Sequence, residues 1–185
     1  MTNIPYITYT AIIIAVIDFI YFNTLTKHYT YDYALYKAGA LRKPLTSKKD
    51  FWRILSAGFV HLSLPHLLVN IYSLYAMGTF LERYLSHELY ALLLIGSIIV
   101  GNLFSLIGNE YSISGGLSSG LYGLMAFEIK LIFMYYGIRG ITGNSGLLTS
   151  ILVNIAMNFM PGIGWKAHLG GAFFGTIFAT ILFMF

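Results

Sequence analysis

The chain of 185 residues contains no cysteine. This absence excludes disulfides, a thiol nucleophile and a cysteine-based metal site. Charge is also scarce, because Lys, Arg, Asp and Glu make up 10% of the residues, whereas soluble domains carry roughly 25%. With 57% hydrophobic residues and a mean hydropathy of +0.73, the chain has too few polar side chains to cover a water-facing surface. We therefore expect a membrane protein with several spans.

Apolar runs long enough to cross a bilayer divide the chain, since a span needs about 20 mostly apolar residues. We predict one all-α domain over residues 1–185, with no repeat and no soluble appendage. Its six membrane helices are predicted at residues 4–25, 57–81, 89–107, 116–136, 145–160 and 165–185. Pro65 lies inside the second run, so that helix should begin or kink near it. Residues 161–164 read as a turn.

The connection from residue 26 to residue 55 carries seven of the eleven basic residues and tyrosines at positions 29, 31, 33 and 36. Aromatic and basic side chains together suit a membrane interface, and we expect a partly ordered loop at the headgroups, with a solvated linker as the alternative. The basic residues lie between apolar runs, which does not indicate nucleic-acid binding. Asp18 lies inside the first span, where an acid is a functional candidate; the plainer interpretation is a neutral or hydrogen-bonded acid facing the bundle.

A stretch rich in glycine and serine leads into the fourth span, and residues 116–120 within it fit the pattern G-x-S-x-G. Alone, this pattern is weak evidence for a nucleophilic serine, and it also fits a small-residue packing face. A serine nucleophile needs a base. His168 in the sixth span can serve if the fourth and sixth helices touch, and Gly171 and Gly175 on its face would permit close contact.

His66 and Asn70 in the second span share a helix face by their i, i+4 spacing. Attack on an amide creates an oxyanion that needs hydrogen-bond donors, and these two side chains could supply them. A competing hypothesis is a metal site made by His61, His66 and His168. The offset of five between the first two does not place them on one face, and no carboxylate lies at a neighbouring helical position. We therefore expect no metal and no cofactor.

Five motifs in chain order resemble the rhomboid family of intramembrane serine proteases. They are Trp52-Arg53, the segment from His61 to Asn70, Glu82-Arg83, Gly116-Leu117-Ser118 with Tyr122 four residues on, and Ala167-His168-Leu169-Gly170-Gly171 with Gly175. The resemblance covers about two-thirds of the chain, and the first helix matches only as a helix. No single motif is specific, but five in the right order on the right helices are a strong signal.

The resemblance implies a six-helix rhomboid-like bundle in which Ser118 is the nucleophile and His168 the base, a dyad without an acid. Tyr122 would pack against the His168 ring, His66 and Asn70 would bind the oxyanion, and Gly116, Gly171 and Gly175 would support the site. The fifth helix would be a lateral gate, residues 160–165 a cap, and transmembrane segments of other proteins the substrates.

The sequence also departs from the family pattern. Ser119 stands where the family usually has glycine, so two adjacent serines compete; we choose Ser118 because Tyr122 then keeps its offset. Ser86 stands where a glycine is expected.

Membrane orientation is a point of conflict. The first loop and Lys166 place eight of the eleven basic residues on one side. The positive-inside rule would make that side cytoplasmic, whereas the family topology would place it outside. We prefer the family topology and expect a prokaryotic plasma membrane.

Three other functions stay open at this point. One is a catalytically inactive rhomboid-like protein that binds membrane helices, and another is a specialised protease that cuts a C-terminal sorting segment. A small transporter or channel would require paired charges or broken helices in matching halves, and we single out only Asp18 as a candidate for that function. The sequence does not indicate an oligomeric state.

Overall fold

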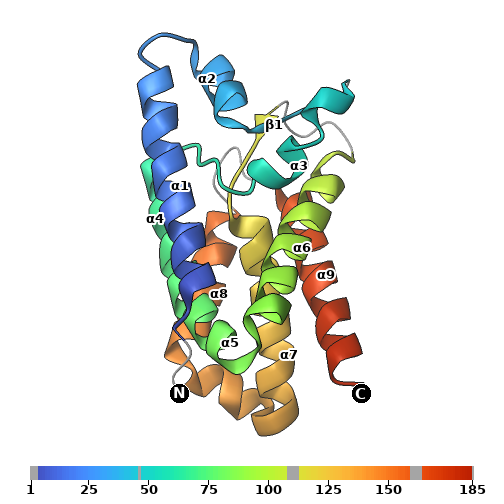
Figure 1. The fold of residues 1–185 in the computed structure, drawn as a ribbon. Helices are drawn as coiled ribbons and strands as arrows, with labels where there is room; N and C mark the ends of the chain where they lie inside the picture. The colour runs from blue at the N-terminus through green and yellow to red at the C-terminus, as the bar shows by residue number, and fades with distance from the viewer. Residues whose placement is uncertain (1–3, 46, 108–112, 159–163, 185) are drawn as a thin grey trace.

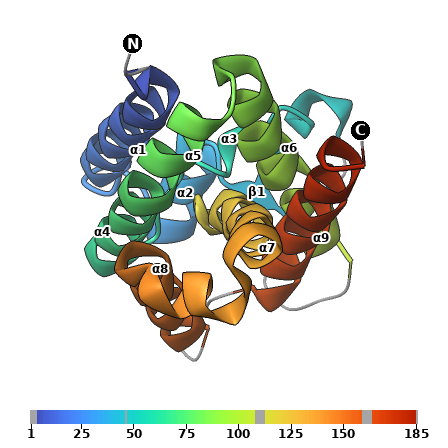
Figure 2. The ribbon, with the colours of Figure 1, turned by 90° about the horizontal axis from the view of Figure 1, so that it is seen from below.

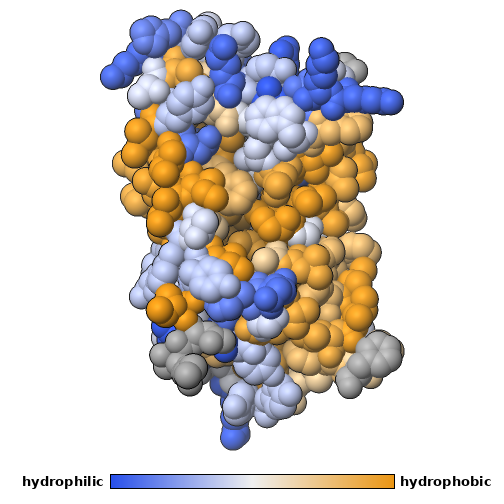
Figure 3. Space-filling view, in the orientation of Figure 1, coloured by the Kyte–Doolittle hydropathy of each residue, from blue (hydrophilic) through white to orange (hydrophobic). Residues whose placement is uncertain are grey.

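The computed structural model describes residues 4–45, 47–107, 113–158 and 164–184. The turn predicted at residues 161–164 and the cap predicted at residues 160–165 lie outside these ranges except for residues 164 and 165. Three of the described helices are long and apolar enough to cross a membrane: α1 (Tyr6–Leu25), α6 (His87–Ser105) and α7 (Ser118–Gly143). Figure 3 shows a broad apolar band between two more hydrophilic ends. Length, composition and this surface together identify a helical membrane protein.

The other long segments pack beside these three helices. α4 (Leu64–Ser73), the π-helical turn η2 (Leu74–Gly78) and α5 (Thr79–Tyr84) follow one another directly, and α8 (Ser145–Met157) and α9 (Trp165–Leu182) complete the bundle (Figure 1). Seen from below, α7 lies near the centre, with α1, α4, α8, α9 and α6 around it (Figure 2). A residue at the start of α7 is therefore surrounded by protein.

Several helices begin at other residues than the predicted bounds, and for two of them the structure shows the reason. The second helix begins at Leu64 rather than residue 57, because Ser63 caps it by accepting a hydrogen bond from the backbone N–H of His66 (3.4 Å) and Pro65 occupies its first turn. The fourth begins at Ser118 rather than residue 116, because Gly116 has φ of +135°, a left-handed conformation outside the helical region. α7 also continues past residue 136 to Gly143.

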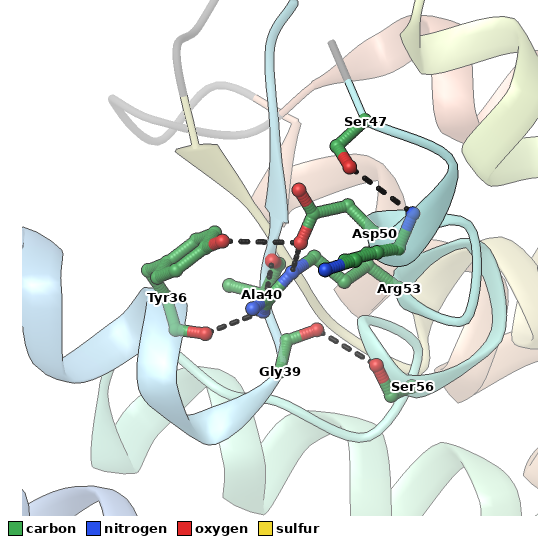
Figure 4. Close-up of polar contacts among 8 residues, drawn as sticks. Tyr36, Gly39, Ala40, Ser47, Asp50, Arg53 and Ser56 are labelled. Carbon is green, nitrogen blue, oxygen red and sulfur yellow. Dashed lines mark hydrogen bonds and ion pairs between the residues drawn. The ribbon is translucent and has the colours of Figure 1, made fainter. Parts of the chain in front are cut away.

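The first loop is more ordered than predicted, and Arg53 organises it. The loop contains α2 (Tyr31–Ala38), β1 (Leu41–Arg42), the short helix η1 (Lys48–Asp50) and α3 (Arg53–Ser56). The Arg53 guanidinium donates to Asp50 Oδ1 (2.8 Å) and to the carbonyls of Tyr36 and Ala40 (Figure 4). The bond from Arg53, helped by one from the Tyr36 hydroxyl, holds the pKa of Asp50 below its usual value.

The loop is tied to the segment that enters α7. β1 pairs antiparallel with β2 (Ile113–Ser114), with Leu41 opposite Ser114. The Gly116 N–H then donates to the carbonyl of Ala57 (2.8 Å). These backbone bonds fix the approach to α7, whose first turn lies below β1 in Figure 1.

Glu82 fastens α1 to the bundle. Its buried carboxylate accepts from the backbone N–H groups of Ile7 and Thr8 (both 2.8 Å), from the Thr8 hydroxyl (2.7 Å) and pairs with His87 Nδ1 (2.9 Å). N–H groups in the first turn of a helix have no partner within the helix, so a carboxylate from α5 satisfies them here. The Asp18 carboxylate differs from that of Glu82 in its hydrogen bonding, because its Oδ2 is buried without a hydrogen-bond partner in the described residues.

We predict that Glu82→Gln loosens α1, because an amide offers one acceptor oxygen where the carboxylate offers two. Leaving buried donors unpaired costs about 1–3 kcal/mol, to be measured as a lower free energy of unfolding in detergent micelles. Glu88→Gln is the control, since Glu88 is exposed. Equal stability of the two variants would contradict this role for Glu82.

Candidate active site

Ser118 and His168 meet in the interior of the bundle. Ser118 is the first residue of α7, and its Oγ lies 2.8 Å from Nε2 of His168 on α9. His168 is buried, with 5% of its surface exposed. A hydroxyl hydrogen-bonded to an imidazole nitrogen is the pairing that activates a serine as a nucleophile.

Close helix packing makes this contact possible. Gly171 of α9 lies against the carbonyl of Ser119, and Gly175 against the carbonyl of Gly123, so the backbones of α7 and α9 are in contact one turn apart. A side chain at either glycine would collide with that backbone. The spacing predicted a face with two gaps, and the structure places α7 against it.

The two adjacent serines have different surroundings. Ser119 is 1% exposed, its Oγ has no hydrogen-bond partner among the described residues, and it faces Gly101 of α6. Ser118 faces His168 instead. Of the two hydroxyls, the one of Ser118 is therefore the one in contact with the imidazole.

Tyr122 lies one turn after Ser118, and its ring stacks on the His168 ring with centroids 4.3 Å apart and an angle of 6° between the planes. Its hydroxyl donates to the carbonyl of Asn154 on α8 (3.1 Å). Stacking restricts the tilt of the imidazole, while the hydroxyl connects the site to α8.

Sequence reasoning missed Asn158, the C-cap residue of α8. Its Oδ1 lies 2.6 Å from Nδ1 of His168, and its Nδ2 donates to the Tyr122 hydroxyl (2.5 Å). A signal was present, since Asn154 and Asn158 are spaced i, i+4 in an otherwise apolar run and therefore share a face.

His66, Gly116, Ser118 and His168 line a cavity of about 40 Å³, room for about two or three waters. A Cβ at Gly116 would come within 2.7 Å of the His66 ring and 3.6 Å of Asn70 Nδ2. The backbone just before Ser118 thus lies beside both predicted oxyanion donors, and the positive φ and the lack of space both favour glycine there.

His61 holds Asn70 in place. Asn70 Nδ2 donates to His61 Nε2 (3.0 Å), and His61 Nδ1 donates to the carbonyl of Phe59 (2.9 Å). The second hydrogen of the Asn70 amide stays available for an oxyanion. In the described parts of the chain, no group of three His, Asp or Glu side chains is arranged to bind a metal ion.

Comparison with known proteins places this sequence in a family. A family profile described as the Rhomboid domain matches residues 48–185. The chain belongs to the rhomboid family. It is 30% identical over 152 residues to RHOMBOID-like protein 7 of Arabidopsis thaliana, which covers 80% of this chain and 48% of that protein. It is 24% identical over 145 residues to Rhomboid protease GluP of Bacillus subtilis, covering 78% and 28%.

Not every relative of this rhomboid chain is an enzyme. It is 32% identical over 132 residues to Inactive RHOMBOID-like protein 8 of Arabidopsis thaliana, covering 70% of this chain and 37% of that protein. The chain spans half or less of the length of these relatives. The rhomboid family contains membrane proteases and some inactive members, so membership alone does not decide whether this chain is active. Its activity has to be argued from its own site.

Proposed function

We propose that this rhomboid protein is an intramembrane serine endopeptidase that cleaves transmembrane segments of other proteins through Ser118 and His168. The observation that carries the proposal is the 2.8 Å contact between Ser118 Oγ and His168 Nε2, which lies partly buried among the helices of a membrane protein. Polar groups among membrane helices are costly. A serine paired with an imidazole beside a cavity can act as a nucleophile on a bound substrate.

The first step forms an acyl-enzyme. His168 Nε2 takes the Ser118 proton as Oγ attacks the carbonyl carbon of the scissile peptide bond. The carbonyl oxygen becomes an oxyanion, which His66, the free Asn70 N–H and the Ser118 backbone N–H stabilise. His168 then gives its proton to the leaving amine, and the C–N bond breaks.

The second step releases the product. A water in the 40 Å³ cavity gives a proton to His168 and attacks the acyl carbon, and Ser118 leaves with the proton returned to its Oγ. No cofactor is needed for either step. Water has to reach this site from one end of the bundle. We expect it to enter from the end that carries the polar first loop.

We also propose the finer architecture. The domain covers residues 1–185 and has six spans. One span is the continuous stack of α4, η2 and α5, and the other five are α1, α6, α7, α8 and α9. By resemblance α8 is the lateral gate, and the protein resides in a prokaryotic plasma membrane with the lipid bilayer as its surroundings. A substrate helix would enter beside α8 and unwind where small residues weaken it.

The direct test is cleavage in liposomes. The purified protein is reconstituted with a model transmembrane substrate, and a fluorophosphonate probe is added in parallel to label a nucleophilic serine covalently. Cleavage together with labelling of Ser118 is the expected result. Labelling without cleavage points to a narrower substrate, such as a C-terminal sorting segment. Neither one, in protein shown to be folded, would favour an inactive membrane-helix binder and overturn the proposal.

Asn70→Ala should lower kcat by about 10²–10³, the usual cost of one oxyanion donor, and leave KM nearly unchanged, because the donor acts on charge that develops only in the transition state. Steady-state cleavage rates measure both constants. Asn23→Ala on α1 is the matched control, since its exposed amide donates to the Phe19 carbonyl of its own helix. Unchanged kcat in Asn70→Ala would remove Asn70 from the oxyanion site.

A further inference from the structure

The acceptor for the second nitrogen of His168 comes from a third helix. His168 lies on α9 and Ser118 on α7, whereas the group beside Nδ1 is Oδ1 of Asn158 at the end of α8. A histidine that serves as a base needs Nδ1 protonated, so that Nε2 can accept the serine proton. A neutral amide oxygen 2.6 Å from Nδ1 favours that tautomer.

The hydrogen bonds around Asn158 run in one direction. Ser118 donates to His168 Nε2, His168 Nδ1 donates to Asn158 Oδ1, Asn158 Nδ2 donates to the Tyr122 hydroxyl, and that hydroxyl donates to the Asn154 carbonyl. Each donor in the series has an acceptor. Turning the Asn158 amide over would place its NH₂ against Nδ1 and take the proton away from that nitrogen, so the Tyr122 contact fixes the useful orientation.

α8 is held in place at a second point. Asn154 Nδ2 donates to Ser73 Oγ of α4 (2.8 Å) and to the carbonyl of Ser150. Asn154 and Asn158, one turn apart, therefore make polar contacts with α4, α7 and α9. If α8 moves away from α7, the Asn158 amide leaves the His168 ring with it.

We infer that Asn158 is the positioning residue for His168, and that docking of α8 against α7 and α9 completes the catalytic site. The inference rests on the proposed function, with α8 as the helix beside which a substrate enters. Opening the bundle at α8 removes the acceptor from Nδ1, so the base is correctly oriented only after α8 has returned. Hydrolysis is thereby confined to the closed state.

The expected size of the effect follows from what remains when Asn158 is lost. In serine proteases the loss of the residue that orients the histidine lowers kcat by up to about 10⁴. Here Tyr122 still restrains the ring by stacking, so we expect a smaller loss of roughly 10- to 100-fold. Substrate binding at α8 is not expected to depend on this amide.

The test compares three variants in liposomes. Asn158→Leu keeps a side chain of similar size without the acceptor, and we expect kcat to fall about 10- to 100-fold with KM changed less than about twofold. Asn158→Asp retains an acceptor for Nδ1–H and should restore most of kcat. Ser73→Ala is the matched control, because it removes the hydrogen bond between α8 and α4 while Asn158 stays in contact with His168; it should keep kcat within about threefold.

A second measurement does not depend on activity. ¹⁵N chemical shifts of labelled histidine distinguish a protonated Nδ1 from a protonated Nε2, with the His168 signal assigned by its absence in His168→Ala. We expect Nδ1–H in the unmodified protein and in Asn158→Asp, and a mixture in Asn158→Leu. An unaltered His168 signal in Asn158→Leu, or unaltered kcat, would overturn the inference.

These outcomes are separable from failure of the proposed function. If the unmodified protein neither cleaves nor labels, the proposed function fails and the nitrogen spectra still decide whether Asn158 sets the tautomer. If the unmodified protein cleaves and Asn158→Leu is equally active, the protease stands and the positioning role falls. Should Asn158→Leu not fold, Asn158→Ala takes its place in both measurements.

Discussion

Cleavage should fall by at least about 10⁴-fold in Ser118→Ala, and to a similar degree in His168→Ala, because residues that act as one unit are each indispensable. Removing the serine removes the atom that forms the acyl bond. Removing the imidazole leaves the hydroxyl protonated and a poor nucleophile. The measurement is the initial rate of cleavage of a transmembrane substrate in liposomes, with fluorophosphonate labelling in parallel.

Ser119→Ala is the matched control for this prediction. It changes a neighbouring serine of the same helix turn whose Oγ faces α6 and has no hydrogen-bond partner among the described residues. We expect it to keep cleavage within about threefold. Loss of cleavage in Ser119→Ala alone would shift the nucleophile by one residue. Cleavage that survives all three changes would contradict the serine-protease proposal.

The sequence alone predicted much of this site, because its spacing is helical. Offsets of three, four and seven place residues on one face regardless of tertiary structure. That rule relates Ser118 to Tyr122 and places His168 on the face of Gly171 and Gly175. The structure adds the contact between these two faces. The choice between Ser118 and Ser119 also rested on an offset, and the surroundings of the two hydroxyls point the same way.

Spacing alone does not give two sets of contacts, although it does mark Asn154 and Asn158 as sharing a face. Asn158 reaches His168 across a helix interface, and nothing in its local pattern identifies which ring atom it contacts. The order of the first loop depends on Arg53 reaching back to the carbonyls of Tyr36 and Ala40, contacts that join residues 13 and 17 positions apart. Local sequence propensity predicts neither the contact of Asn158 nor those of Arg53. Hydropathy alone sets the second helix from residue 57 and does not register the cap at Ser63, whereas Pro65 does indicate a start near the observed one.

Orientation in the bilayer also lies beyond the local pattern. The first loop carries most of the basic residues, yet several of them are occupied: Arg53 binds Asp50 and loop carbonyls, and Lys37 lies over the rings of Tyr29 and Tyr33. The positive-inside rule counts these residues regardless of their contacts. The family topology therefore stays a prediction.

The second large effect is expected at the contact between α7 and α9. A Cβ at Gly171 would collide with the backbone carbonyl of Ser119, and backbone cannot rotate away as a side chain can. Gly171→Ala should therefore separate the two helices, lower the free energy of unfolding by about 1–3 kcal/mol, as overpacked cores do, and move His168 away from Ser118. Unfolding in micelles and fluorophosphonate labelling of the folded fraction measure the two consequences separately.

Gly143→Ala tests whether the loss comes from the contact and not from a change of glycine in general. Gly143 ends α7 with nothing within 4 Å of an added Cβ, and alanine is favoured over glycine in a helix by up to about 1 kcal/mol. This variant should be as stable as the unmodified protein or slightly more so, with full labelling. If Gly171→Ala behaved in the same way, the two helices would not be in backbone contact. The dyad would then need another explanation for its short distance, because the approach of α7 and α9 at Gly171 and Gly175 is what brings the serine and the histidine together.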